Sequence, residues 1–167
     1  MTLVRLHNDD WGYESNCFVC EERNEGGLRL RFFHEHDPAT GRDVVVAEFS
    51  LPDRFSGAPT MVHGGVTLAI LDEAMAWACI AVGHRWAVTT ETSTRFDRPV
   101  RVGSHYRVEA EVVDHVDATM RTAATIVDRR GGVRAEAAAS FTTLGEAQAV
   151  RLAGVDLGDE HRAYLDR

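Results

Sequence analysis

A single stretch of apolar residues limits the folds that this chain can adopt. From Gly64 to Gly83 the sequence runs GGVTLAILDEAMAWACIAVG, 20 residues in which Asp72 and Glu73 carry the only charges. Its length and its content of Ala, Leu, Ile and Met predict one helix of roughly 30 Å, ended by Gly83. Because this helix is apolar on nearly every side, other elements must bury it.

Composition and charge exclude several classes of protein. The two acidic residues inside the apolar run argue against a membrane span, and the first 13 residues lack the apolar core of a signal peptide. The 167 residues carry 26 acidic and 18 basic side chains, a net charge of −8, which disfavours nucleic acid or an anionic membrane as partner. Every basic side chain is Arg, so lysine-based chemistry is ruled out. With only three cysteines, we expect a soluble cytoplasmic protein.

Alternating apolar and polar residues on both sides of the helix predict β-strands. The expected strands are 28–32, 44–51, 88–96, 106–112, 120–127 and 133–143. The short turns between them permit antiparallel pairing only, which predicts an α+β fold: a curved antiparallel sheet of about five to six strands wrapped around one long central helix. One sheet cannot cover every side of the helix, so we expect a dimer.

The chain divides into three parts on the same pattern. Residues 1–27 are polar and rich in turns, which indicates a leader or loop with at most one short helix. Residues 28–144 contain the long helix and the strands. Residues 145–167 form a polar tail with room for a short helix.

Two glycines follow a histidine where the helix begins, as His63-Gly64-Gly65. Each Gly costs about 1 kcal/mol relative to Ala inside a helix, so a pair there needs a reason. One interpretation is a tight turn with close packing. The other is a site where unshielded N–H groups and the helix dipole stabilise a carbonyl oxygen that gains negative charge. The local residues leave both interpretations open.

Asp72 is the second candidate. A buried carboxylate without a partner is unfavourable, so Asp72 implies a role or a specific partner, unless it and Glu73 share an exposed stripe. Asp72 lies eight residues, ~12 Å, beyond Gly64, whereas a catalytic base must lie within ~3 Å of the reacting atom. One helix cannot supply both groups to one carbonyl. Two antiparallel helices at a two-fold axis can, which predicts a composite site in a dimer.

These residues resemble those of the hotdog-fold thioesterases, in the phenylacetic-acid-type acyl-CoA thioesterase branch. The resemblance covers roughly residues 17–143, and the order of the expected elements agrees with it. It rests on His63-Gly64-Gly65 with Asp72 nine positions after the His, on Cys17-Phe18-Val19-Cys20 with Gly27-Leu28-Arg29-Leu30, on Val62, and on Phe96-Asp97-Arg98-Pro99-Val100 with Gly103.

The resemblance implies the hotdog fold, a homodimer or dimer of dimers, and hydrolysis of an acyl-CoA to free acid and CoA without a cofactor. By the same analogy the Gly64 N–H, helped by Gly65, polarises the thioester carbonyl. Asp72 of the other subunit acts as nucleophile or as general base for water, two roles that stay open. His63 contacts the thioester or orients the loop.

Further positions take expected roles from the resemblance. Thr89, or Thr90 if the strand register slips by one, holds water or the carboxylate. Glu73 is the alternative working carboxylate, and Ala76 leaves room for an acyl group or for closely packed helices. Candidates for binding the CoA phosphates are Arg98, Arg101 and Arg121.

One departure from the family keeps a second function open. Several relatives carry Asn or Gln six positions before the histidine, where this chain has Gly57. Loss of that side-chain donor favours, as the alternative, a non-catalytic hotdog module that binds acyl-CoA as sensor or partner.

A metal site is the weaker interpretation of the cysteine and histidine pairs. Cys17-x-x-Cys20 with His34 and His36 supplies residue types that bind zinc but not the usual finger spacing. We therefore expect packed cysteines and no metal.

Overall fold

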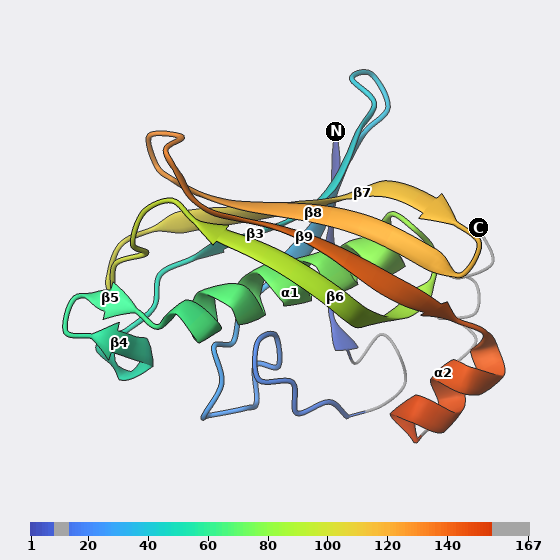
Figure 1. Cartoon of the computed structure of the whole chain (residues 1–167), viewed down its shortest axis with the longest axis horizontal. Helices are drawn as coiled ribbons and strands as arrows, with labels where there is room; N and C mark the ends of the chain where they lie inside the picture. Colours follow the sequence, from blue (N-terminus) through green and yellow to red (C-terminus); the bar gives the residue numbers. More distant parts are fainter. Residues whose placement is uncertain (9–13, 155–167) are drawn as a thin grey trace.

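A computed structural model describes residues 1–8 and 14–154. In it a seven-stranded antiparallel sheet curves around helix α1 (Gly64–Ala81), in the strand order β1-β2-β3-β7-β8-β9-β6 (Figure 1). The expected α+β architecture is confirmed. The strands of the sheet are β1 (Thr2–Leu6), β2 (Phe32–Asp37), β3 (Arg42–Phe49), β6 (Trp86–Phe96), β7 (Tyr106–Val116), β8 (Thr119–Asp128) and β9 (Val133–Leu144).

Shorter elements lie at the two ends of α1. A 3-10 turn, η2 (Asp53–Phe55), and the hairpin of β4 (Ser56–Ala58) and β5 (Met61–Val62) lead into its N-terminus. Helix α2 (Glu146–Ala153) follows β9, and is the short helix for which the tail has room. Residues 9–13 of the expected leader and 155–167 of the expected tail lie outside the described residues.

Helix α1 forms the core together with the inner face of the sheet. Fully buried side chains of the helix, such as Ile70 and Met75, pack in one cluster with Phe32, Ile126 and Phe141 of the strands. By length and hydropathy alone α1 could cross a membrane, but half of it is buried inside the fold. The buried half packs against the inner face of the sheet.

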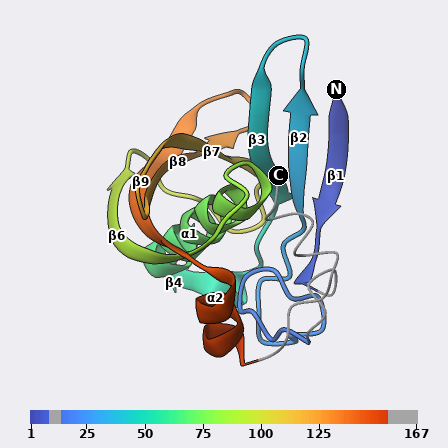
Figure 2. The same cartoon turned by 90° about the vertical axis from the view of Figure 1, so that its right-hand side faces the viewer.

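Residues 14–31, called the N-terminal segment below, cover the side of α1 that the sheet leaves open (Figure 2). Leu28 and Leu30 are buried there, but they lie in a loop rather than in the strand expected at 28–32. Their N–H groups donate to the carbonyls of Phe18 and Val19, both at 2.8 Å, and Arg29 between them has a left-handed φ of 58°. The alternation of apolar and polar residues at 28–32 therefore reflects the burial of Leu28 and Leu30 in a loop. The strand itself begins only at Phe32.

Strand β1 is absent from the sequence prediction. Residues 2–6, placed there in a leader or loop, pair antiparallel with β2 from Thr2↔His36 to Leu6↔Phe32. Four of the five side chains are exposed, so the strand has no apolar alternation to reveal it. The sheet consequently has seven strands instead of five or six.

Gly83 follows α1 for a reason different from the expected helix-ending conformation. The helix ends at Ala81, and the left-handed residue is His84, with a φ of 52°. A Cβ on Gly83 would lie 2.4 Å from Met120 Cε and 2.8 Å from the carbonyl oxygen of Cys79. Gly83 is therefore required by the close approach of β8 to the end of the helix.

We expect Gly83→Ala to lower the free energy of unfolding by about 1–3 kcal/mol, because the added methyl overpacks a closed site. Chemical denaturation measures this directly. The control is Gly26→Ala, whose Cβ would meet only Asn24 Oδ1 at 3.5 Å and should change stability by less than about 0.5 kcal/mol. Equal stability of the two variants would contradict the packing argument.

Candidate functional site

The N-terminus of α1 is capped by a histidine. His63 has an extended backbone, and its Nδ1 accepts a hydrogen bond from the Gly65 N–H at 2.9 Å. The N–H groups of Val66 and Thr67 donate to the His63 carbonyl, both at 3.0 Å. Within residues 1–8 and 14–154, the Gly64 N–H has no hydrogen-bond partner. Of the two glycine donors expected at this site, Gly65 serves the cap and Gly64 stays available to a ligand.

The histidine ring also explains two of the nearby glycines. A Cβ on Gly65 would lie 3.1 Å from His63 Nδ1, and one on Gly57 would lie 3.0 Å from His63 Cδ2. Both positions are therefore small so that the ring can fold over the helix start. Because Nδ1 accepts a hydrogen bond, the neutral ring carries its proton on Nε2. Gly64 differs, since a Cβ there would meet only the Phe96 ring at 3.8 Å.

A pocket of about 460 Å³ opens at this helix end. Its lining includes His63, Gly64, Phe96 and Arg98. The pocket thus combines the Gly64 N–H, at the positive end of the helix dipole, with the guanidinium of Arg98. These two groups suit a ligand that carries or develops negative charge.

Asp72 lies in the middle of α1 and is oriented by a threonine. Thr89 Oγ1 of β6 donates to Asp72 Oδ1 at 2.9 Å. The ladder with β9 shifts register between Thr89 and Glu91, so Thr90 is the extra residue of a bulge and its hydroxyl donates to the Ser140 carbonyl instead. Of the two threonines that the sequence leaves open, the structure brings Thr89 to Asp72.

Glu73, the next residue, has a different environment. Its Oε1 accepts a hydrogen bond from Cys17 Sγ at 3.4 Å. The pKa of Glu73 is raised to about 8, chiefly by burial and then by the neighbouring acidic groups Cys17 and Asp72. Adjacent helix positions point about 100° apart, which separates the two carboxylates.

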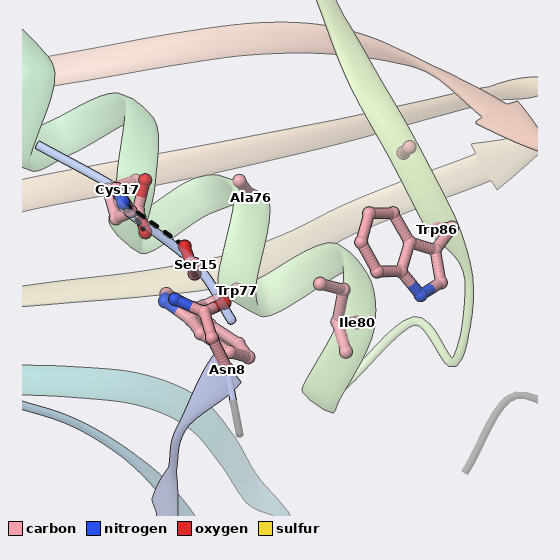
Figure 3. Close-up of a pocket in the computed structure, with 9 residues that line it drawn as sticks. Asn8, Ser15, Cys17, Ala76, Trp77, Ile80 and Trp86 are labelled. Atoms are coloured by element: carbon pink, nitrogen blue, oxygen red, sulfur yellow. Dashed lines mark hydrogen bonds between the residues drawn. The ribbon is translucent and has the colours of Figure 1, made fainter. Parts of the chain in front are cut away.

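Glu73 borders a second pocket, of about 210 Å³. Figure 3 shows Ala76 and Ile80 of α1 on one side of it and Trp86 of β6 opposite, with Cys17 of the N-terminal segment. The walls near Ala76 are apolar, as an acyl group requires.

Several sequence candidates line neither pocket, among them Asp72, Thr89 and Arg101. Arg121 forms an ion pair with Asp114 at 3.0 Å on the outer face of the sheet, where its side chain is 56% exposed. His34 and His36 form a separate cluster with Asp43 and do not join the cysteines. The contact that the sequence does not reveal is Cys17 with Glu73, since 56 positions separate the two residues and no spacing rule connects them.

Comparison with known proteins was made on sequence and on structure. Residues 60–135 match the model of the Thioesterase superfamily. A search of curated proteins returned no match. Among solved structures, a thioesterase superfamily protein is similar over 71% of this chain and 56% of its own, at 24% identity and a TM-score of 0.65. This chain therefore spans little more than half of that protein.

Two further structures have the same fold. The Escherichia coli PaaI protein from the phenylacetic acid degradation operon has 22% identity and a TM-score of 0.57, over 61% of this chain and 73% of its own. A hypothetical thioesterase with coenzyme A from Streptococcus pneumoniae TIGR4 has 18% identity and a TM-score of 0.58, over 61% of this chain and 79% of its own. These likenesses confirm the hotdog fold.

We expect His63→Ala to lower the free energy of unfolding by about 1 kcal/mol, because the Gly65 N–H loses its acceptor. His63→Asn should retain most of that stability, since Asn is among the best N-cap residues. Urea denaturation of the two variants beside the wild type measures the difference. A loss of the same size in both would show that the ring contributes by packing rather than by capping.

Proposed function

We propose that this chain is a hotdog-fold thioesterase that hydrolyses acyl-CoA thioesters to a carboxylic acid and CoA, as the match of residues 60–135 to the Thioesterase superfamily supports. The observation that carries the proposal is the Asp72 carboxylate held by Thr89 at 2.9 Å, on a helix whose first N–H, that of Gly64, stays free among the described residues. An oriented carboxylate and an unpaired donor at the positive end of a helix are the two groups that acyl transfer needs.

The chemistry follows from these two groups. The thioester carbonyl oxygen accepts a hydrogen bond from the Gly64 N–H, which stabilises the negative charge that develops there. In one route Asp72 removes a proton from the water that attacks the carbonyl carbon, the C–S bond breaks, and the proton passes to the sulfur of CoA. In the other route Asp72 attacks the carbonyl carbon itself, the C–S bond breaks to release CoA as its thiolate, and water then hydrolyses the resulting mixed anhydride to the free acid and the Asp72 carboxylate. Thr89 fixes the carboxylate in the orientation that either route requires.

The two groups belong to different subunits in this proposal. Eight residues separate Gly64 from Asp72, about 12 Å along the helix axis, which is too far for one carbonyl. Support for a dimer comes from β6, which pairs only with β9 in the described part of the chain and is exposed from Thr89 to Ser93. Pairing of β6 with its copy would continue the sheet and set two α1 helices antiparallel.

The substrate follows from the pockets and from the relatives. The apolar pocket at Ala76 and Trp86 would take the acyl group, and Arg98 would meet the CoA phosphates. The Streptococcus pneumoniae relative was solved with coenzyme A, and the PaaI relative comes from a phenylacetic acid operon. We place the chain in the same phenylacetic-acid-type branch and in the cytoplasm. Arg121, on the outer face, would reach CoA only across a dimer of dimers.

Release of free thiol from acetyl-, hexanoyl-, palmitoyl-, phenylacetyl- and benzoyl-CoA tests the activity. We expect Asp72→Asn to lower kcat/KM by ~10²-fold or more. We expect a loss of similar size, ~10²-fold, in Gly64→Pro, because proline removes the N–H donor. Proline suits the first helical position, and His63 before it is extended, with φ −60° and ψ 136°.

Gly64→Ala is the matched control, since it keeps the N–H and its Cβ meets only Phe96 at ordinary contact distance. It should remain close to the wild type. If no ester is hydrolysed by the wild type while CoA esters raise its melting temperature, the chain is the non-catalytic acyl-CoA-binding module instead.

Mixed dimers test the shared site. Gly64→Pro and Asp72→Asn chains, co-expressed with different tags and purified as heterodimers, should regain activity. One of their two sites would combine an intact Gly64 N–H with an intact Asp72. Each homodimeric variant, assayed at equal concentration, provides the baseline. Heterodimers as inactive as the homodimers would place both groups of one site in a single chain.

A further inference from the structure

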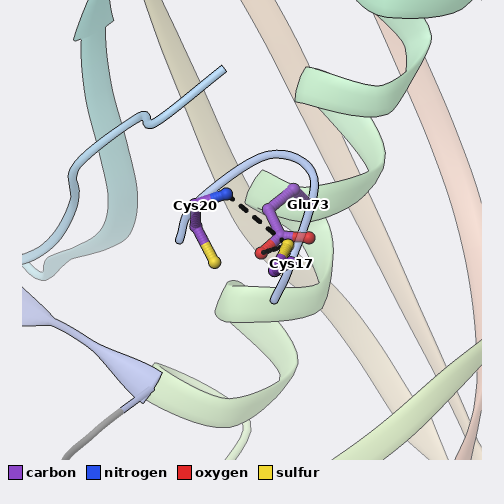
Figure 4. Close-up of side chains that lie close together, drawn as sticks. All are labelled: Cys17, Cys20 and Glu73. Carbon is purple, nitrogen blue, oxygen red and sulfur yellow. Dashed lines mark hydrogen bonds between the residues drawn. The ribbon is translucent and has the colours of Figure 1, made fainter. Parts of the chain in front are cut away.

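Two thiols and a carboxylate converge on the open side of α1. Cys17 and Cys20 lie on one turn of the N-terminal segment, and Glu73 reaches them from the helix (Figure 4). The sulfur atoms and a carboxylate oxygen all lie within 4.8 Å of one another. Cys20 is 8% exposed, so the cluster lies at the boundary of the core.

The cluster is acidic, and the part of the chain that the structure describes brings no basic side chain into an ion pair with it. Within residues 1–8 and 14–154, no Arg or His forms an ion pair with Glu73, and the helix neighbour Asp72 is also acidic. Three groups that lose protons to become anions are therefore packed together. Their deprotonated forms are unfavourable in a buried place without a compensating charge, and a cation bound by all three groups would provide it.

Hydrogen-bond donors point at both sulfur atoms. The backbone N–H groups of Val19 and Cys20 donate to Cys17 Sγ at 3.3 and 3.5 Å. The side-chain amide of Asn8 donates to Cys20 Sγ at 3.1 Å. Donors of this kind stabilise thiolates, and groups around metal sites orient and tune their ligands in the same manner. Two thiols packed merely as small apolar side chains would not need them.

The spacing fits a tetrahedral ion. Zinc binds sulfur at about 2.3 Å and carboxylate oxygen at about 2.0–2.2 Å, so tetrahedral ligands lie about 3.8 Å apart for two sulfurs and about 3.6 Å for sulfur and oxygen. Cys17 Sγ and Glu73 Oε1 are already 3.4 Å apart. The Cys-x-x-Cys spacing is the usual one for a zinc-binding pair.

We propose that Cys17, Cys20 and Glu73 bind one zinc ion, with water in the fourth position. Cys17 and Glu73 both line the pocket of about 210 Å³, so that water would face the pocket. The ion would join the N-terminal segment to the middle of α1 and hold the segment over the helix. The proposal does not rest on the proposed hydrolysis, because neither Asp72 nor Gly64 is a ligand.

The other cluster of ligand types provides an internal control. His34, His36 and Asp43 also lie within 4.8 Å of one another, on the hairpin of β2 and β3. This cluster offers imidazole nitrogens and a carboxylate oxygen as ligand atoms, and no thiolate sulfur. Zinc at the cysteines and zinc at the histidines are thus separable by substitution.

Metal content of the untagged chain, purified under reducing conditions and dialysed, tests the proposal. We expect about one zinc per chain in the wild type by elemental analysis. The zinc should be lost in Cys17→Ser with Cys20→Ser, and at least tenfold less tightly held in Glu73→Gln. Cys79→Ala, at a buried cysteine outside the cluster, and His34→Ala with His36→Ala should keep it.

Cobalt gives a second readout that does not depend on activity or on variants that fold. Titration of the metal-free wild type with Co²⁺ should produce the thiolate-to-cobalt charge-transfer absorption and saturate at one ion per chain. The proposal is overturned if the wild type holds no zinc and gives no such absorption. It is equally overturned if the double serine variant keeps its zinc, or if the histidine variant is the one that loses it.

Discussion

Burial of α1 against the inner face of the sheet is the contact on which the rest of the structure depends. Large apolar side chains such as Ile70, Met75 and Phe141 meet there without exposure to solvent, and each contributes about 1.5–3 kcal/mol when it is fully buried. The same contact fixes the position of the helix start beside the β4–β5 hairpin and of the helix middle beside β6. The Gly64 N–H and the Asp72 carboxylate are therefore held in place by the packing of other residues, the buried apolar side chains of the helix and the sheet.

The neighbouring carboxyl groups of Asp72 and Glu73 have different hydrogen-bond partners because the helix rotates by about 100° between them. Asp72 turns to β6 and receives the Thr89 hydroxyl, on the side where the sheet ends. Glu73 turns to the N-terminal segment and receives the Cys17 thiol. The first carboxyl group thus lies beside the edge strand of the sheet, and the second lies beside two thiols.

Local pattern was enough to predict much of the fold. The apolar run predicts α1 to within two residues at its C-terminus, and alternation predicts the four strands that follow it. The apolar alternation fails to predict a strand that is exposed, and it predicts a strand wrongly where buried residues lie in a loop. The exposed β1 lacks an apolar face, and Leu28 and Leu30 are buried in a loop that Arg29 keeps out of the sheet.

The candidate site also contains residues that the sequence predicted and contacts that it did not. Gly64 and Asp72 of the helix could be named from the residues themselves, whereas Thr89 of β6 was expected only from the resemblance to the hotdog thioesterases. The role of Gly65 as a cap donor depends on the rotation of one imidazole ring, and the meeting of Cys17 with Glu73 depends on the path of an irregular segment. Neither contact can be predicted from the periodicity of apolar residues along the sequence.

A consequence for the evolution of this chain follows from placing a donor and a carboxylate on one helix. Each residue inserted or deleted between Gly64 and Asp72 would rotate the carboxylate by about 100° and move it by about 1.5 Å, away from Thr89 and toward another neighbour. Changes of length are therefore tolerable in turns such as the one between β2 and β3, but not in the first half of α1. In that half of the helix the number of residues matters as much for the position of Asp72 as their identity does.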